Sequence, residues 1–100
     1  MNYQLRRVAE RDLEDIWFYS FEMWGVDQAD NYIRSLIARF EWLSNSPTSG
    51  RKRNDIKSGY NCFPEGEHVI FYKVDNGVVD IIGVLHHSQD VVSYLREKMD

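Results

Sequence analysis

Residues 77–86 read GVVDIIGVLH, the most strand-like stretch of this 100-residue chain. β-Branched residues dominate it, and such residues favour extended backbone. Apolar side chains occupy both alternating positions: Val79, Ile81 and Leu85 share one parity, and Val78, Ile82 and Val84 share the other. A strand that is apolar on both faces is typical of the centre of a covered sheet. We therefore expect a central strand whose second face is covered by the C-terminal segment of the chain or by a partner protein.

The segments before this stretch continue the sheet. YNCF at 60–63 and EHVIFYKV at 67–74 are rich in aromatic and β-branched residues. The turn signals PEG at 64–66 and DNG at 75–77 separate the three segments. This pattern predicts a three-stranded antiparallel meander. Residues 2–8, NYQLRRV, predict one further short strand.

Three helices complete the predicted fold. Apolar residues follow helical spacing from Leu13 to Trp24, where Gly25 is a natural stop, and again from Asp27 to the SNSPTSG loop at 44–50. A short helix is expected at about 89–98. Acidic residues crowd the first turns of the first helix, where the helix dipole favours negative charge: Glu10, Asp12, Glu14 and Asp15.

The expected fold class is α+β within a single domain, residues 1–100. An N-terminal strand precedes an antiparallel helical hairpin that packs on one face of a small antiparallel sheet, and a short C-terminal helix closes the chain.

Composition and charge limit the partners. The net charge of −4 gives no overall excess of cations for binding nucleic acid, so sequence-specific contacts to nucleic acid are not expected. One local basic run stands out: Arg51, Lys52, Arg53 and Lys57. The single cysteine, Cys62, excludes an intramolecular disulfide and suits a reducing cytoplasm. No signal peptide or membrane span is expected.

The segment LHHSQD at 85–90 carries two histidines beside an aspartate. Adjacent residues of a strand point to opposite faces, so His86 and His87 are not expected to bind one metal ion. Ser88 lies in no nucleophile motif. We expect a capping role instead, with Ser88 or His87 as the helix N-cap and Asp90 in the first turn. No cofactor or metal is therefore predicted.

With these segments in hand, the sequence resembles the ParE family of the RelE/ParE toxin–antitoxin superfamily. The resemblance rests on five stretches in a fixed order: AERDLEDIWFYS at 9–20, WGVDQADNYI at 24–33, SPTSG at 46–50, IKSGYNCFPEGEHVIFYKV at 56–74 and VLHHSQDV at 84–91. It implies a toxin of a type II toxin–antitoxin system that inhibits DNA gyrase without being an enzyme. It also implies neutralisation by a ParD-like antitoxin, a dimeric ribbon–helix–helix protein whose tail wraps the toxin.

Two departures from the family bear on catalysis. Asn61 and Gly83 stand where family members often carry arginine. The related RelE branch cleaves mRNA on the ribosome and needs cationic groups to stabilise the charged transition state. Their absence at these positions argues against a nuclease. That activity remains the first alternative, with the basic run as phosphate clamp and His86 or Tyr94 as acid–base group. A non-toxic antitoxin-binding module is the second.

Aromatic and apolar side chains of the sheet and second helix supply the expected antitoxin contacts: Trp42, Tyr60, Phe63, Ile70, Tyr72, Ile81 and Leu85. Contacts to the target are expected from the basic run and two further residues: Arg51, Lys52, Arg53, Lys57, His86 and Tyr94.

Overall fold

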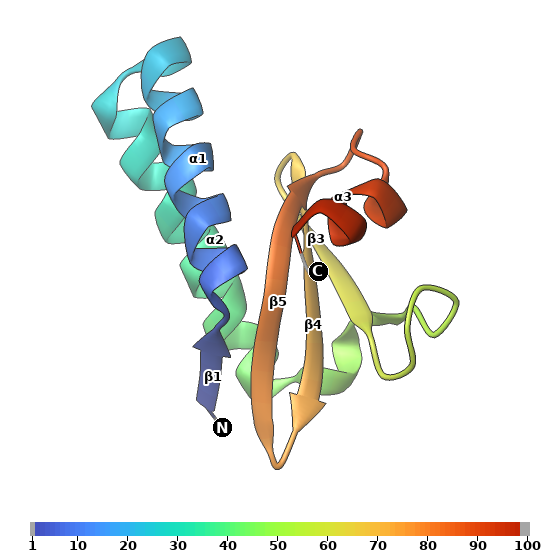
Figure 1. Ribbon diagram of the computed structural model, residues 1–100. Coiled ribbons are helices and arrows are strands. Elements are labelled where there is room, and N and C mark those ends of the chain that lie inside the picture. Colours follow the sequence, from blue (N-terminus) through green and yellow to red (C-terminus); the bar gives the residue numbers. More distant parts are fainter. Residues whose placement is uncertain (1, 99–100) are drawn as a thin grey trace.

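The computed structural model describes residues 2–98 and has an α+β fold, as predicted (Figure 1). Its elements, in chain order, are β1 (Asn2–Leu5), α1 (Arg7–Trp24), α2 (Val26–Asn45), a 3-10 turn (Pro47–Ser49), β2 (Arg51–Lys52), β3 (Asn61–Glu65), β4 (His68–Asp75), β5 (Val78–His86) and α3 (Val91–Lys98). No helix within residues 2–98 combines the length and apolar character needed to cross a bilayer.

The sheet has five strands in the order β1-β5-β4-β3-β2. Strands β3, β4 and β5 form the predicted antiparallel meander. Strand β1 pairs with β5 in parallel, so the sheet is mixed rather than wholly antiparallel as predicted. A parallel neighbour needs a crossover connection, which the helical hairpin supplies. The predicted strand at 2–8 is too long, because β1 ends at Leu5 and α1 begins at Arg7.

Glycines end several of these elements as predicted. Gly25 has a φ of 92° and separates α1 from α2. Asn76 and Gly77 join β4 to β5 with φ values of 51° and 76°, the positive pair of a tight hairpin turn. The turn between β3 and β4 comes later than the PEG signal, because β3 continues through Pro64 and Glu65.

A bulge interrupts β5. Phe71 of β4 is paired with Gly83, whereas the next residue, Tyr72, is paired with Ile81. Ile82 is therefore an extra residue in β5, and two consecutive residues oppose one on β4. An inserted residue of this kind resets the alternation of side chains along the strand.

This bulge decides which β5 side chains face which core. Val84 joins Val79 and Ile81 in the cluster that packs under the helical hairpin. Leu85 joins Ile82 in the cluster on the opposite face. The simple parity predicted for residues 78–86 is therefore wrong beyond Ile82, although both faces are apolar as expected.

Two cores lie on the two faces of the sheet (Figure 1). The hairpin of α1 and α2 covers the first core, whose buried residues are Ala9, Ile16, Leu36, Phe40, Leu43, Ile70, Tyr72, Val79, Ile81 and Val84. Helix α3 and residues 56–60 cover the second core, whose buried residues are Tyr60, Cys62, Phe71, Ile82, Leu85 and Tyr94. The chain's own C-terminal helix thus covers the second face of the sheet.

Candidate functional site

The distal half of the helical hairpin extends past the end of the sheet (Figure 1). Its apolar side chains are exposed there, including Trp24 at 63%, Tyr19 at 60% and Phe18 at 58%. We call this surface the aromatic tip, and it comprises Phe18, Tyr19, Phe21, Met23, Trp24 and Val26. Trp24 belongs to the helical stripe that the sequence predicts to be buried. It is exposed because the sheet does not reach the end of α1.

A groove of about 610 Å³ lies between the aromatic tip and the nearby ends of β4 and β5. Tyr19, Trp24 and Tyr32 supply aromatic surface from the two helices, and His68 and His86 line the groove from the sheet. The carboxylates of Asp15 and Glu67 also line it. We call it the distal groove. A concave, mainly aromatic surface with a few polar groups is suited to binding another protein segment.

Tyr32 organises the sheet side of the distal groove. Its hydroxyl oxygen accepts a hydrogen bond from the backbone N–H of Glu67 at 2.9 Å and lies 2.6 Å from Nδ1 of His68. Burial, followed by the nearby charge of His86, lowers the pKa of His68 to about 4. His68 is therefore uncharged at neutral pH.

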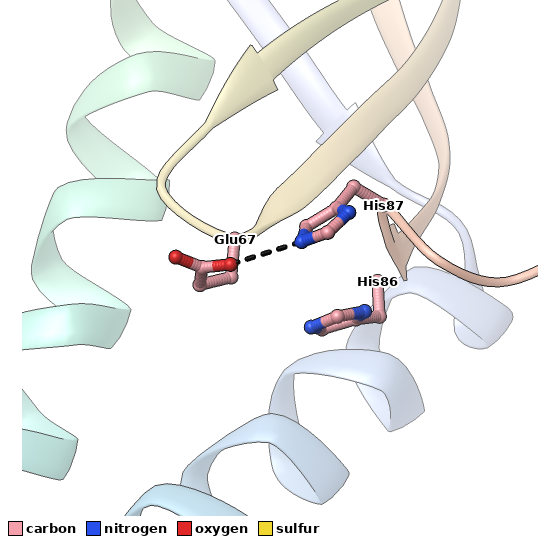
Figure 2. Close-up of side chains that lie close together, drawn as sticks. All are labelled: Glu67, His86 and His87. Carbon is pink, nitrogen blue, oxygen red and sulfur yellow. Dashed lines mark hydrogen bonds and ion pairs between the residues drawn. The ribbon is translucent and has the colours of Figure 1, made fainter.

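All three histidines of the chain meet beside the distal groove. The rings of His86 and His87 lie 4.4 Å apart between centroids, and those of His68 and His86 lie 5.5 Å apart. The prediction that His86 and His87 point to opposite faces is wrong. Strand β5 ends at His86, and His87 lies in the following turn, where strand alternation no longer applies. Figure 2 shows the His87 ring directed toward the Glu67 carboxylate, with the His86 ring nearby.

Asp90 has the predicted capping role at a different position. Helix α3 begins at Val91, so Asp90 is itself the N-cap rather than a residue of the first turn. Its Oδ2 accepts hydrogen bonds from the hydroxyl and the backbone N–H of Ser93, at 2.8 and 3.3 Å. The Ser93 hydroxyl, and then its N–H, hold the pKa of Asp90 below the usual range. These hydrogen bonds fix the start of α3. Asp90 therefore acts as a helix cap and does not pair with a histidine for catalysis.

Asp12 forms a buried junction that the sequence did not predict. Strand β1 ends before it can pair with Val84, and Oδ2 of Asp12 accepts the Val84 N–H instead, at 2.9 Å. The Tyr94 hydroxyl donates to the same oxygen, and Nζ of Lys98 lies 3.6 Å from the other. Burial raises the pKa of Asp12 despite these partners. Asp12 falls on the helical spacing of the other buried α1 residues, Ala9, Ile16 and Ser20, and that spacing is the signal that identifies it.

The same junction explains why residue 83 is a glycine. A Cβ atom added to Gly83 would meet the hydroxyl and ring of Tyr94. Glycine at this position therefore lets Tyr94 of α3 pack closely against β5. Burial, and then the hydrogen bond to Asp12, raise the pKa of Tyr94. A buried phenol of this kind is poorly suited to acid–base chemistry.

The residues expected to bind the antitoxin do not form one surface. Ile70, Tyr72 and Ile81 are fully buried in the first core. Tyr60 and Leu85 are buried in the second core, on the opposite face. The other two are accessible and adjacent: Trp42 is 40% exposed, and its ring lies 5.2 Å from that of Phe63.

The residues expected to contact the target are also dispersed. Lys52 is paired with Asn61, at the first residue of β3. His86 is paired with His68 of β4, which is in turn paired with Glu65, the last residue of β3. These rows are about 13 Å apart along the strands. Tyr94 is buried. The register therefore separates His86 from Lys52, and burial in the second core removes Tyr94 from the surface.

Within the basic run, Arg51, Lys52 and Lys57 are exposed. The guanidinium of Arg53 makes two hydrogen bonds of 3.1 Å with the carboxylate of Asp55. Arg53 is therefore already paired, and the three exposed cations are those available to a partner.

Proteins of one known family share the sequence features of this chain. A family profile described as "ParE toxin of type II toxin-antitoxin system, parDE" matches residues 3–91. The chain belongs to the ParE toxin family. It is 44% identical to Toxin ParE1 of Caulobacter vibrioides over 94 residues, covering 93% of this chain and 96% of that toxin. It is 38% identical to Toxin ParE1 of Mycobacterium tuberculosis over 90 residues, covering 89% and 92% of the two chains.

Solved structures support the ParE fold independently of sequence. A chain of the chromosomal ParDE TA system from P. aeruginosa superposes with a TM-score of 0.74 at 16% identity, covering 86% of this chain and 95% of that one. A chain of the toxin–antitoxin complex RelBE2 from Mycobacterium tuberculosis gives a TM-score of 0.63 at 19% identity, with coverages of 86% and 96%. The fold is therefore shared with a chain of each of these two toxin–antitoxin systems.

Proposed function

We propose that this ParE toxin inhibits DNA gyrase by binding to it, and that a ParD-like antitoxin neutralises it by occupying the distal groove. The aromatic tip beside this groove is the observation that carries the proposal. Contiguous exposed apolar surface on a small domain marks protein–protein contact sites. Tryptophan and tyrosine also contribute disproportionately to the affinity of such interfaces.

The antitoxin is the occupant that best fits the distal groove. The related ParDE and RelBE2 structures are toxin–antitoxin systems, which supports a partner of that class. Acidic side chains of Asp15 and Glu67 at the groove suit a segment that carries Lys or Arg among apolar residues. Trp42 and Phe63 remain predicted antitoxin contacts further along α2 and β3. Tyr60 and Leu85 would take part only if α3 moved off the sheet.

Gyrase binding is proposed from family membership, and the arrangement of charges favours it over mRNA cleavage. Phosphodiester cleavage needs an acid–base group beside cations that face the phosphate. In residues 2–98, Tyr94 is buried against Asp12, and the register separates His86 from Lys52. The exposed cations Arg51, Lys52 and Lys57 are the residues we propose for contact with gyrase or its bound DNA. The cytoplasm is the compartment in which this target is met.

Inducible expression in a bacterial host tests the proposal. We expect growth arrest with induction of the DNA damage response when the toxin is expressed alone. Normal growth should return when the antitoxin gene encoded beside it is co-expressed. Arrest without DNA damage, accompanied by discrete cuts in ribosome-bound message, would select the nuclease instead. Normal growth with intact antitoxin binding would select a non-toxic binding module.

A further inference from the structure

The corner where β3 and β5 end and β4 begins gathers three potential metal-binding side chains. Glu67, His86 and His87 each place one potential ligand atom so that all three atoms lie within 4.8 Å of one another (Figure 2). Two imidazoles and a carboxylate form a donor set that binds zinc in many proteins. The three residues come from the β3–β4 turn, the end of β5 and the turn after it.

Backbone contacts hold this corner together. The N–H of His87 donates to the carbonyl oxygen of Glu67 at 3.0 Å, which joins the two turns directly. The N–H of Glu67 donates to the Tyr32 hydroxyl at 2.9 Å, and His86 is paired with His68 in the sheet. The three backbone positions are therefore fixed before any ion binds, which reduces the ordering cost of forming a site.

A metal ion would replace or rearrange the present side-chain contacts of these residues. Nδ1 of His86 lies 2.7 Å from the Ser88 hydroxyl and accepts a hydrogen bond from the Ser88 backbone N–H at 3.2 Å, so Nε2 is the nitrogen that a metal ion would take. When Nε2 is a ligand, the proton moves to Nδ1, which gives up the Ser88 N–H bond and donates to the Ser88 hydroxyl, the kind of contact that orients a metal-bound histidine. Nε2 of His87 lies 3.0 Å from Oε2 of Glu67, which shows that these two donors already converge.

We propose that Glu67, His86 and His87 bind one Zn²⁺ ion through a carboxylate oxygen and two Nε2 atoms, with water as the fourth ligand. Zinc suits three nitrogen and oxygen donors in a tetrahedral arrangement at about 2.0–2.2 Å from the metal. Magnesium and calcium prefer oxygen donors alone, so they are not expected here. The ion replaces the hydrogen bond between His87 and Glu67 with two metal–ligand bonds.

Only small side-chain movements are needed. Two ligands of one zinc ion lie about 3.4 Å apart in a tetrahedral site, and the donors here lie within 4.8 Å. The side chains of His87 and Glu67 are 57% and 71% exposed, so no packing opposes rotation toward a shared ion. Because Glu67 and His86 also line the distal groove, a bound ion would change that wall from net negative to net positive.

Zinc titration of the full-length toxin tests the proposal. We expect one ion bound per chain with a micromolar dissociation constant at neutral pH. The substitutions Glu67→Gln, His86→Gln and His87→Gln should each weaken binding about tenfold or more. His68→Gln and Glu14→Gln are the matched controls and should leave the affinity unchanged. Circular dichroism of each variant would establish that it is folded.

Cobalt provides a second readout that reports the ligands directly. Co²⁺ in a tetrahedral nitrogen and oxygen site should give visible absorption bands that His87→Gln abolishes. The proposal would be overturned by the absence of zinc binding at micromolar concentrations. It would also be overturned if the three ligand substitutions left the affinity unchanged, or if His68→Gln weakened it equally.

Discussion

Asp12 connects α1, β5 and α3 through a single buried carboxylate. It occupies the point where β1 ends and Val84 would otherwise have an unpaired N–H in the interior. The Asp12 carboxylate thus accepts the hydrogen bond that a longer β1 would accept from Val84. The sequence indicated an ordinary charged residue near the start of a helix, because helix-dipole reasoning considers only neighbours along the chain.

Removing the Asp12 carboxylate should destabilise the fold. We expect Asp12→Ala to lower the free energy of unfolding by about 2–4 kcal/mol, because Val84 N–H and the Tyr94 hydroxyl both lose their buried partner. Urea denaturation measures this change. Glu14→Ala, on the exposed side of the same helix, is the control and should change stability by less than about 0.5 kcal/mol. Equal effects of the two substitutions would show that the junction contributes nothing.

His68 should make stability depend on pH. Its folded pKa of about 4 lies below the ordinary value of 6.5, because the folded protein disfavours the charged ring. This contribution to stability is therefore fully present above pH 6.5 and is lost as the pH falls toward 4. The groups that face His68 are Tyr32, Glu67, His86 and His87.

Urea denaturation at pH 7 and pH 5 measures this dependence on the metal-free protein. The wild type should lose more stability between the two pH values than His68→Gln does, and NMR should show the His68 ring titrating near pH 4. Glu14→Gln, at an exposed position of α1, should retain the wild-type dependence. A ring that titrates near 6.5 would contradict the burial and hydrogen bonding described here.

At the scale of elements, α3 packs on β5 where the Tyr94 ring lies over Gly83. In the wild type, Gly83→Ala should cost about 1–3 kcal/mol, because its methyl group overlaps the tyrosine. In a Tyr94→Ala background the same substitution should cost little. A double-mutant cycle by urea denaturation should therefore give a coupling energy above about 1 kcal/mol. Additive effects would mean that α3 does not pack over Gly83 in solution.

The end of α1 should act in binding rather than in folding. Trp24 is 63% exposed, so Trp24→Ser should change stability by less than about 0.5 kcal/mol. The affinity for the antitoxin should fall about tenfold or more, because a central tryptophan commonly dominates an interface. Calorimetric titration with the antitoxin measures this. Val92→Ser, an exposed apolar control on α3, should bind normally, and equal losses from both substitutions would argue against the distal groove.

The order of the longer elements followed from the sequence because each carries a local signal, whereas the two-residue strand β2 was not predicted. Apolar periodicity predicted α1 and α2, and Gly25, Asn76 and Gly77 ended segments where positive φ is needed. The parallel pairing of β1 with β5 did not follow, since no local pattern encodes which strand a terminal segment joins. The bulge at Ile82 was also missed, and it redistributed Val84 and Leu85 between the two faces.

The candidate site was harder to predict for the same reason. The LHHSQD segment was recognisable as a family feature, but the approach of His87 to Glu67 depends on a turn that brings two hairpin ends together. Trp24 of the aromatic tip was placed on the buried stripe of α1, because helical spacing alone does not reveal how far a sheet extends along a helix. Its exposure follows from the relative lengths of α1 and the sheet.

At the scale of the whole molecule, the fold presents an aromatic groove on one side and an exposed basic run at the far edge of the sheet. We expect the groove to meet the antitoxin and the basic run to meet gyrase or its DNA. On this proposal, the two surfaces would give the toxin separate contacts for its inhibitor and its target. The antitoxin would then block gyrase by steric overlap or by holding the toxin in a large complex.

Purified toxin added to DNA gyrase in a supercoiling reaction is the most direct measurement. We expect micromolar toxin to inhibit supercoiling and to trap cleaved DNA, and we expect the antitoxin to relieve both effects. Replacing Arg51, Lys52 and Lys57 with Ser should weaken inhibition while leaving antitoxin binding intact. Unchanged supercoiling with no cleaved DNA, from folded toxin that still binds its antitoxin, would contradict gyrase as the target.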